Sequence, residues 1–385
     1  MKLPFFEGEL VRRSSLVFMA ALFANLIALI ANLIIANILG TEFFGTFKVI
    51  IYLFAFLPMF AELGINSSLT KYIAEFGKDS GKSKYIIKWF LKLKLISYIL
   101  LIAVVFLLKD YIAFYFLKDV SMSYLILAGI ILLSFNYFGT FTSIALGFQN
   151  FRLYSFSQFL ASAASALLAV LLSPLGIFYM VIGWGLGIFV GNIPNVLFLI
   201  KKTFRKYENV DMKRLFLKFN LLSYPTEFIT SLFTAIIPFL SFFFSQRLLG
   251  YYSFAFMFYY AAILIPSSLS IVLFPKFSEL DGLKRYDHAK NILKTSFLYY
   301  TLIVIIGLVL VFLLSEWFIA FVAKDYLPSL LMFKVIVSLG LILGYNVIYA
   351  NYLRGLGKVK KYALVTLIQN ILLIIASFAL LNSMV

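Results

Sequence analysis

The sequence contains no cysteine and a single histidine, and only 13% of its 385 residues are charged. The missing cysteines exclude a disulfide scaffold, and zinc, haem and iron–sulfur centres lack their usual ligands. Soluble domains carry about 25% charged residues. The low charge therefore excludes a single soluble domain and a disordered chain, and we expect no metal and no cofactor.

Apolar side chains are abundant instead, at 63% of the sequence. A helix needs about 20 apolar residues to cross a membrane, and eleven stretches reach that length. They lie at residues 14–39, 45–65, 87–108, 122–147, 153–174, 176–200, 218–244, 250–274, 292–315, 327–350 and 360–383. The stretches exceed the length of barrel strands and lack a period of two. The pattern predicts an all-α integral membrane protein with about 11 transmembrane helices.

The positive charges lie unequally on the two sides of these stretches. Of 33 Lys and Arg residues, 27 lie on the side of the N-terminus, and only Lys109, Lys118, Arg247 and Lys324 lie on the other. Basic loops remain in the cytoplasm, so we expect a cytoplasmic N-terminus in a multi-pass protein of the cell membrane. This topology accounts for the net charge of +17 without a nucleic-acid partner.

The two halves of the sequence resemble each other weakly. FGTFKVIIYLFAF pairs with LGYYSFAFMFYYA, so that Gly45 matches Gly250, and later Gly147 matches Gly355. The similar offsets predict a duplication with two lobes in parallel orientation. We assign residues 1–205 to an N-lobe of six spans. Residues 206–385 form a C-lobe of five spans, because the partner of the stretch 176–200 would fall beyond the end of the sequence.

Longer segments carry a resemblance to a known family. The segments NILGTEFFGTFKVIIYLFAFLPMFAELGINSSLTKYIAEF, LLGYYSFAFMFYYAAILIPSSLSIVLFPKFSEL and LRGLGKVKKYAL resemble polysaccharide and oligosaccharide flippases. These O-antigen-type transporters belong to the multidrug/oligosaccharidyl-lipid/polysaccharide exporter superfamily. The resemblance covers nearly the whole chain. It implies a MATE-like fold whose lobes alternate to flip a polyprenyl-(pyro)phosphate-linked oligosaccharide to the outer leaflet, for surface polysaccharide or glycan assembly.

Polar side chains interrupt two of the predicted spans. Asn25 and Asn32 are about two turns apart on one face of the stretch 14–39. The stretch 218–244 places a polar set within an arc of about 100°. Its members are Ser223, Glu227, Thr230, Ser231 and Thr234. The two stripes either line a hydrated cavity for the substrate or form hydrogen bonds between packed helices.

Glu227 is the most informative of these residues. A carboxylate near the middle of a span costs about 2.5–3.5 kcal/mol on insertion scales. It is a candidate for coupling transport to Na⁺ or H⁺, which burial would favour by raising its pKa. The alternative is that Glu227 reaches cytoplasmic water beside Pro225.

Cations are arranged along a possible substrate route. Arg12, Arg13 and Lys218 stand at the inner mouths of two spans, whereas Lys48 and Lys334 lie within spans. A pyrophosphate requires compensating cations, and arginine binds it through two hydrogen bonds. We expect the mouth residues to receive the head group, and Lys48 and Lys334 to draw it outward. Alternatively, the mouth residues only fix the topology and anchor lipid headgroups, and Lys48 extends to the interface.

Two further stripes are interpreted as helix packing. One consists of Gln158, Ser162 and Ser165, and the other consists of Gly183, Gly187 and Gly191.

Three other functions compete with that of a flippase. A cation-coupled multidrug exporter of the same superfamily is the main alternative, although an inventory of cations and amides suits anionic, sugar-bearing cargo better. A lipid-handling enzyme needs paired carboxylates or a metal cluster, which the sequence lacks, and the outer loops GTEFFG and SPLG are too short for a catalytic domain. A scaffold without transport activity does not explain the polar stripes. We therefore expect a transporter whose partners are lipid-linked oligosaccharide, membrane lipids and Na⁺ or H⁺.

Overall fold

The computed structural model describes residues 9–76, 81–202, 208–215, 224–225, 228–229 and 231–384. All regular secondary structure in these ranges is helical, which confirms the predicted fold class. The chain forms two compact units. Unit 1 contains Met1–Phe18, Asn32–Gly45 and Phe244–Val385, and unit 2 contains Met19–Ala31 and Thr46–Phe243. The lobe boundary at residue 205 stays a prediction.

Helix α1 (Glu9–Phe56) contributes segments to both units. Unit 2 adds a series of long helices and short helical segments that run to residue 241. They are α2 (Met59–Glu62), α3 (Ile65–Phe76), α4 (Gly81–Leu107), α5 (Lys109–Ile112), η1 (Ala113–Leu117), η2 (Val120–Met122), α6 (Ser123–Asn136), η3 (Tyr137–Gly139), α7 (Thr140–Gly147), α8 (Phe151–Leu171), η4 (Ser173–Leu175), α9 (Ile177–Lys201), α10 (Met212–Leu215), η6 (Leu232–Ala235) and α12 (Ile236–Ser241).

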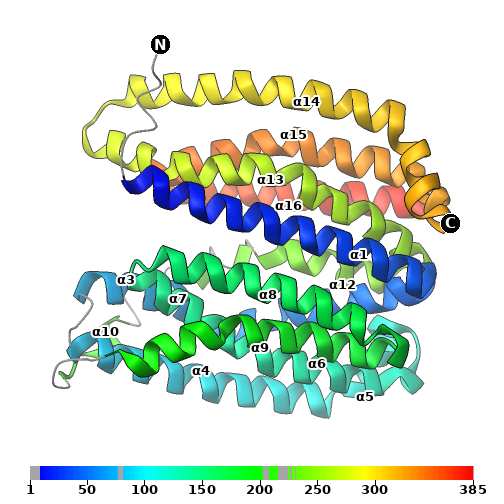
Figure 1. Ribbon diagram of the computed structural model, residues 1–385, viewed down its shortest axis with the longest axis horizontal. Helices are drawn as coiled ribbons and strands as arrows, with labels where there is room; N and C mark the ends of the chain where they lie inside the picture. Colours follow the sequence, from blue (N-terminus) through cyan, green and yellow to red (C-terminus); the bar gives the residue numbers. More distant parts are fainter. Residues whose placement is uncertain are drawn as a thin grey trace. The chain divides into compact units, whose positions relative to one another are not determined.

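Unit 1 adds the helices of the C-terminal part. They are α13 (Gln246–Gly282), α14 (Tyr286–Val322), η7 (Lys324–Ser329), α15 (Leu330–Gly355) and α16 (Val359–Asn382). Helix α15 packs against α13, α14 and α16, and Figure 1 shows these helices running side by side. Phe277, Tyr300 and Ile348 are fully buried in the core between α13, α14 and α15.

Nine helices in the described ranges are long and apolar enough to span a membrane. The first of them, Phe18–Glu62, contains two predicted stretches, 14–39 and 45–65. A kink separates the two stretches, because Gly40 has a non-helical backbone with φ 68° and ψ 178°. The stretch 218–244 is only partly described, as the short apolar helix Leu232–Ser241. The count of eleven therefore stays a prediction.

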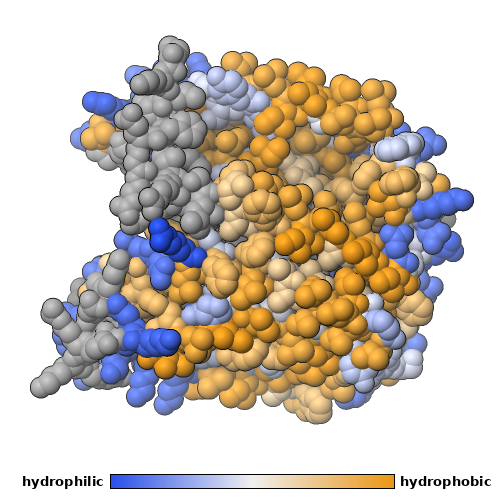
Figure 2. Space-filling view, viewed as in Figure 1, coloured by the Kyte–Doolittle hydropathy of each residue, from blue (hydrophilic) through white to orange (hydrophobic). Residues whose placement is uncertain are grey.

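The exposed surface along the helices is apolar, as contact with lipid requires. In Figure 2, apolar side chains cover the lengths of the helices, whereas polar side chains gather near the helix ends. On α14, Leu313 is 73% exposed and Phe321 is 78% exposed. Such a continuous apolar surface is stable in hydrocarbon but not in water. The chain is a multi-pass membrane protein.

The small-residue stripe on α9 packs tightly against α8. A Cβ atom at Gly187 would overlap the backbone of Ser165, and one at Gly191 would overlap Ala161. The Ser165 hydroxyl donates a hydrogen bond to the carbonyl oxygen of Trp184 at 2.8 Å. The close approach of the two backbones confirms that the glycine stripe serves helix packing, in which Ser165 takes part.

The paired glycines of the predicted repeat meet in unit 1. A Cβ atom at Gly45 would overlap the carbonyl oxygen of Gln246, and one at Gly250 would overlap the carbonyl oxygen of Thr41. Thr41 and Gln246 each precede their own glycine by four residues, so the contact between α1 and α13 is reciprocal. The reciprocal contact joins the two glycines that the predicted repeat pairs, and the duplication itself stays a prediction.

Candidate functional site

Unit 2 contains a cavity of about 230 Å³ whose lining is largely polar. It is lined by Ala55, Pro58, Met59, Glu62, Tyr98, Asn136 and Ser231. These residues come from α1, α2, α4, α6 and the residue that precedes η6.

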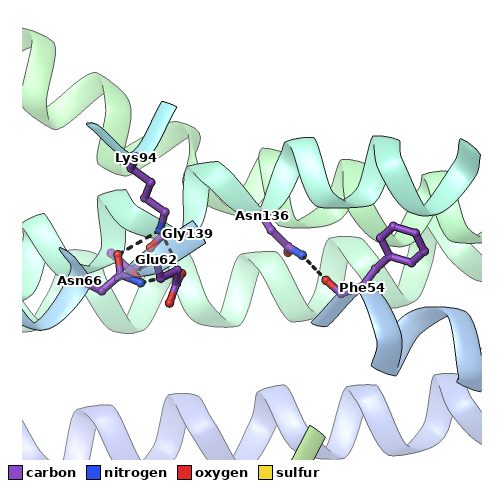
Figure 3. A network of polar contacts seen from close by, with 7 residues as sticks. Phe54, Glu62, Asn66, Lys94, Asn136 and Gly139 are labelled. Atoms are coloured by element: carbon purple, nitrogen blue, oxygen red, sulfur yellow. Dashed lines mark hydrogen bonds and ion pairs between the residues drawn. The ribbon is translucent and has the colours of Figure 1, made fainter. Parts of the chain in front are cut away.

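A broken helix forms one wall of this cavity. Proline has no N–H, so Pro58 cannot donate the helical hydrogen bond to the carbonyl oxygen of Phe54, four residues earlier. The Asn136 side chain supplies the missing donor, with Nδ2 at 3.0 Å from that oxygen (Figure 3). Leu63 and Gly64 then adopt left-handed conformations and end α2 directly after Glu62. The break thus places Glu62 at a helix terminus beside the cavity.

Glu62 belongs to a buried ion pair. Lys94 Nζ lies 3.0 Å from Glu62 Oε1 and 3.2 Å from Asn66 Oδ1, and Asn66 Nδ2 donates to Glu62 Oε1 at 2.9 Å (Figure 3). The Lys94 side chain is 0% exposed, whereas that of Glu62 is 29% exposed. The Lys94 ammonium also lies 5.3 Å from the centroid of the Tyr98 ring.

The ion pair makes the site electrically neutral. A buried charge within a span is costly unless a counter-ion compensates it, and Lys94 and Glu62 compensate each other. The hydrogen bonds from Asn66 and the ring of Tyr98 add to this compensation. The described lining of the site therefore offers polar atoms and, with Lys94 paired to Glu62, no net charge. The described residues contain no cluster of three or more histidine or acidic side chains that could bind a metal ion.

Several predicted site residues cannot be placed. The side chains of Arg12 and Arg13 lie outside the described part of the structure, although their backbone belongs to α1. The other residues that lie outside the described ranges are Lys218, Ser223, Glu227 and Thr230. The proposed roles of all six stay predictions.

The described residues of the predicted polar stripes differ in exposure and in hydrogen-bond partners. Asn25, in unit 2, is exposed and donates to the carbonyl oxygen of Ala21 at 2.7 Å. Asn32, in unit 1, is 8% exposed. The hydroxyl of Thr234 donates to the carbonyl oxygen of Ser231 at 2.7 Å, within its own turn. Asn25 and Thr234 thus satisfy their polar groups locally.

The two cations predicted within spans differ in burial. Lys48 is 5% exposed, with its ammonium 6.0 Å from the ring centroid of Phe47 and 5.9 Å from that of Tyr52. Lys48 therefore lies inside unit 2 and not at the protein surface. Lys334 is half-buried on α15 in unit 1.

Sequence reasoning does not find the central pair of the cavity. A count of charges places Lys94 among the basic residues at the cytoplasmic end of a span, and Glu62 stands out only for its position near the end of another. The sequence feature that could have indicated this pair is the presence of opposite charges within consecutive spans. A charge buried in a span needs a partner of opposite sign. The roles of Tyr98 and Asn136 have no comparable signal, since both residue types are common in membrane helices.

The fold is shared with solved structures of transporters. The chain matches the structure described as lipid II flippase MurJ in an inward closed conformation, with TM-score 0.71 and 16% identity over 95% of this chain and 87% of that one. It also matches the MATE multidrug transporter DinF-BH, with TM-score 0.64 and 16% identity over 99% of this chain and 96% of that one. An inward-facing MATE transporter of the MOP superfamily matches with TM-score 0.63 and 12% identity, covering 98% and 95% of the two chains. The protein has the fold that these flippase and multidrug transporter structures share.

The family follows from a separate comparison. The model of the polysaccharide biosynthesis protein family matches residues 10–281. The chain belongs to this family, which confirms the resemblance found in the sequence. A search of curated protein sequences gives no significant match.

Proposed function

We propose that the protein is a flippase for polyprenyl-(pyro)phosphate-linked oligosaccharide, which it moves from the cytoplasmic to the outer leaflet by alternating access. The match of residues 10–281 to the polysaccharide biosynthesis family carries this proposal. The fold shared with a lipid II flippase supports a lipid-linked cargo. The protein acts in the cell membrane with a cytoplasmic N-terminus, as a transporter and not as an enzyme.

The charges within the helices suit such a cargo. Lys48 holds a cation among apolar helices, beside two aromatic rings that stabilise it. Cations at membrane depth are costly and mark the pathways of charged substrates. Arg12, Arg13 and Lys218 receive the pyrophosphate at the inner side, and Lys48 and Lys334 draw it outward. Glu227 is the proposed group for coupling to Na⁺ or H⁺.

Deletion of the gene should make a complete lipid-linked oligosaccharide accumulate on the cytoplasmic face of the membrane. Lipid mass spectrometry identifies the accumulated species, and an impermeant lectin reports its sidedness. Complementation with the intact gene must remove the accumulation. An unchanged lipid-linked pool in a strain without a second flippase would contradict the proposal.

Arg13→Ala and Lys48→Ala should each abolish complementation without preventing membrane insertion, because each removes a cation from the route of the pyrophosphate. Lys109→Ala is the matched control, since Lys109 lies outside the spans beside Asp110. Because the sequence has no cysteine, one introduced cysteine and an impermeant maleimide report insertion without background labelling. Normal flipping by both variants would refute the assigned route.

A cation-coupled multidrug exporter is the second candidate, because several MATE transporters share the fold. This function predicts that deletion leaves the lipid-linked pool unchanged and raises the cellular retention of a cationic dye. The same deletion strain therefore separates the two functions.

A further inference from the structure

The cavity beside the ion pair contains polar atoms that the protein leaves unused. Tyr98 lines the cavity and is 2% exposed, and its hydroxyl has no hydrogen-bond partner. The hydrogen bonds of Glu62 with described residues all involve Oε1, so Oε2 accepts none from them. Asn136 uses Nδ2 for the carbonyl oxygen of Phe54. A buried polar group without a partner is destabilising, so the Tyr98 hydroxyl points to a ligand, whereas the Glu62 side chain is 29% exposed and its Oε2 is open to one.

The charge and chemistry of the lining restrict that ligand. Lys94 already neutralises Glu62, and a second charge would be uncompensated among apolar helices. The buried Tyr98 hydroxyl lacks a hydrogen-bond partner, and Glu62 Oε2 can accept a hydrogen bond from a donor on the ligand. A hydroxyl group can pair with both atoms, because it donates one hydrogen bond and accepts up to two. The lining therefore selects a neutral ligand that carries several hydroxyls.

The size and the apolar wall of the cavity restrict it further. A single water occupies about 30 Å³, so a cavity of about 230 Å³ has room for several waters or for one ring-sized molecule. Ala55, Pro58 and Met59 add apolar surface to the lining. A ring with C–H faces and hydroxyl edges would contact both kinds of surface.

We propose that this cavity is a subsite for one sugar ring of the oligosaccharide cargo. The subsite rests on the proposed flippase function, and it adds recognition of the glycan to recognition of the pyrophosphate. The Tyr98 hydroxyl and Glu62 Oε2 bind the ring hydroxyls, and the Lys94 ammonium holds Glu62 in place as a positioning residue.

Ligand-observed NMR on the purified full chain in detergent tests the subsite. The probes are free glucose, galactose and N-acetylglucosamine, with cyclohexanol as the ring that lacks multiple hydroxyls. At least one sugar should bind in the millimolar range, and cyclohexanol should not compete. Tyr98→Phe should weaken sugar binding by about tenfold, the upper range for loss of one neutral hydrogen bond. Tyr137→Phe is the matched control, because the Tyr137 hydroxyl donates to the carbonyl oxygen of Leu91 and does not line the cavity.

Thermal unfolding ensures that binding is compared between folded proteins. Tyr98→Phe should not lower the melting temperature, because the lost hydroxyl makes no hydrogen bond within the protein. Ala55→Leu provides a second variant, since Ala55 is an exposed residue of the lining and a larger side chain fills the cavity. It should remove sugar binding while the fold persists.

The outcomes separate the subsite from the flippase function. Sugar binding that depends on Tyr98 and Ala55, together with accumulation of lipid-linked oligosaccharide in the deletion strain, establishes the subsite. The same binding with an unchanged lipid-linked pool shows a sugar site that does not serve this cargo, and it overturns the assignment to flipping. Binding that neither variant changes, or a cavity that holds only water, overturns the subsite. In that case accumulation of lipid-linked oligosaccharide in the deletion strain still supports the flippase function.

Discussion

Replacing Glu62 by leucine should destabilise the protein by about 3 kcal/mol or more, because it leaves a buried ammonium without its carboxylate. Lys94 is 0% exposed and its Nζ lies 3.0 Å from Glu62 Oε1. Asn66 Oδ1, at 3.2 Å, is a neutral acceptor and cannot compensate a full charge. Thermal unfolding in detergent, followed by tryptophan fluorescence, measures the loss.

Two further variants, Lys94→Met and the double variant Glu62→Leu/Lys94→Met, separate two contributions to stability. One is the cost of burying a single unpaired charge, and the other is the net contribution of the ion pair. Lys94→Met should cost less than Glu62→Leu, because the Glu62 side chain is 29% exposed and its charge is partly solvated. The double variant should recover most of the stability, since two apolar side chains often replace a buried ion pair without loss.

An exposed ion pair provides the control. Lys109 Nζ lies 2.9 Å from Asp110 Oδ1, with side chains 31% and 55% exposed. The hydrogen bond from Lys109 lowers the pKa of Asp110, but solvent screens such pairs and they contribute little to stability. Asp110→Asn should leave the melting temperature unchanged. A Glu62→Leu variant as stable as Asp110→Asn would show that Lys94 is not buried as an ion.

The spans could be predicted from the sequence because a membrane helix needs a long apolar run, and such runs are visible without any contact information. The α8–α9 packing could be predicted for a similar reason: Gly183, Gly187 and Gly191 recur every four residues and mark one helix face. The break at Pro58 is harder to predict. Its local effect on hydrogen bonding is known, but the position of Asn136, which replaces the lost bond from another helix, depends on tertiary structure.

The cavity could not be predicted for the same physical reason. Lys94 and Glu62 are 32 residues apart, and a count of loop charges assigns Lys94 to the cytoplasmic interface because other lysines precede it. Only the packing of α4 against α2 shows that its ammonium points to Glu62. The side chain of Asn25 donates a hydrogen bond to the preceding turn of its own helix, and its predicted place in the lining of a cavity stays a prediction.

Alanine at Gly45 or at Gly250 should destabilise the protein by about 3 kcal/mol, the upper end of the usual cost of overpacking. In each case the new Cβ atom overlaps a backbone carbonyl, of Gln246 or of Thr41, which cannot move away by a change of rotamer. The helices α1 and α13 must separate instead. Thermal unfolding measures the loss, and Gly139→Ala serves as the control because a Cβ atom there meets no other atom within 4 Å.

The double variant tests the reciprocal geometry itself. Gly45 and Gly250 contact each other's helix at one crossing, so a single separation of α1 from α13 relieves both overlaps. Mutations that share one structural change are not additive, and the double variant should therefore cost little more than either single variant. Full additivity would mean that the two glycines act at independent contacts. One separation of α1 from α13 would then not relieve both overlaps, and the two glycines would not share a single helix crossing.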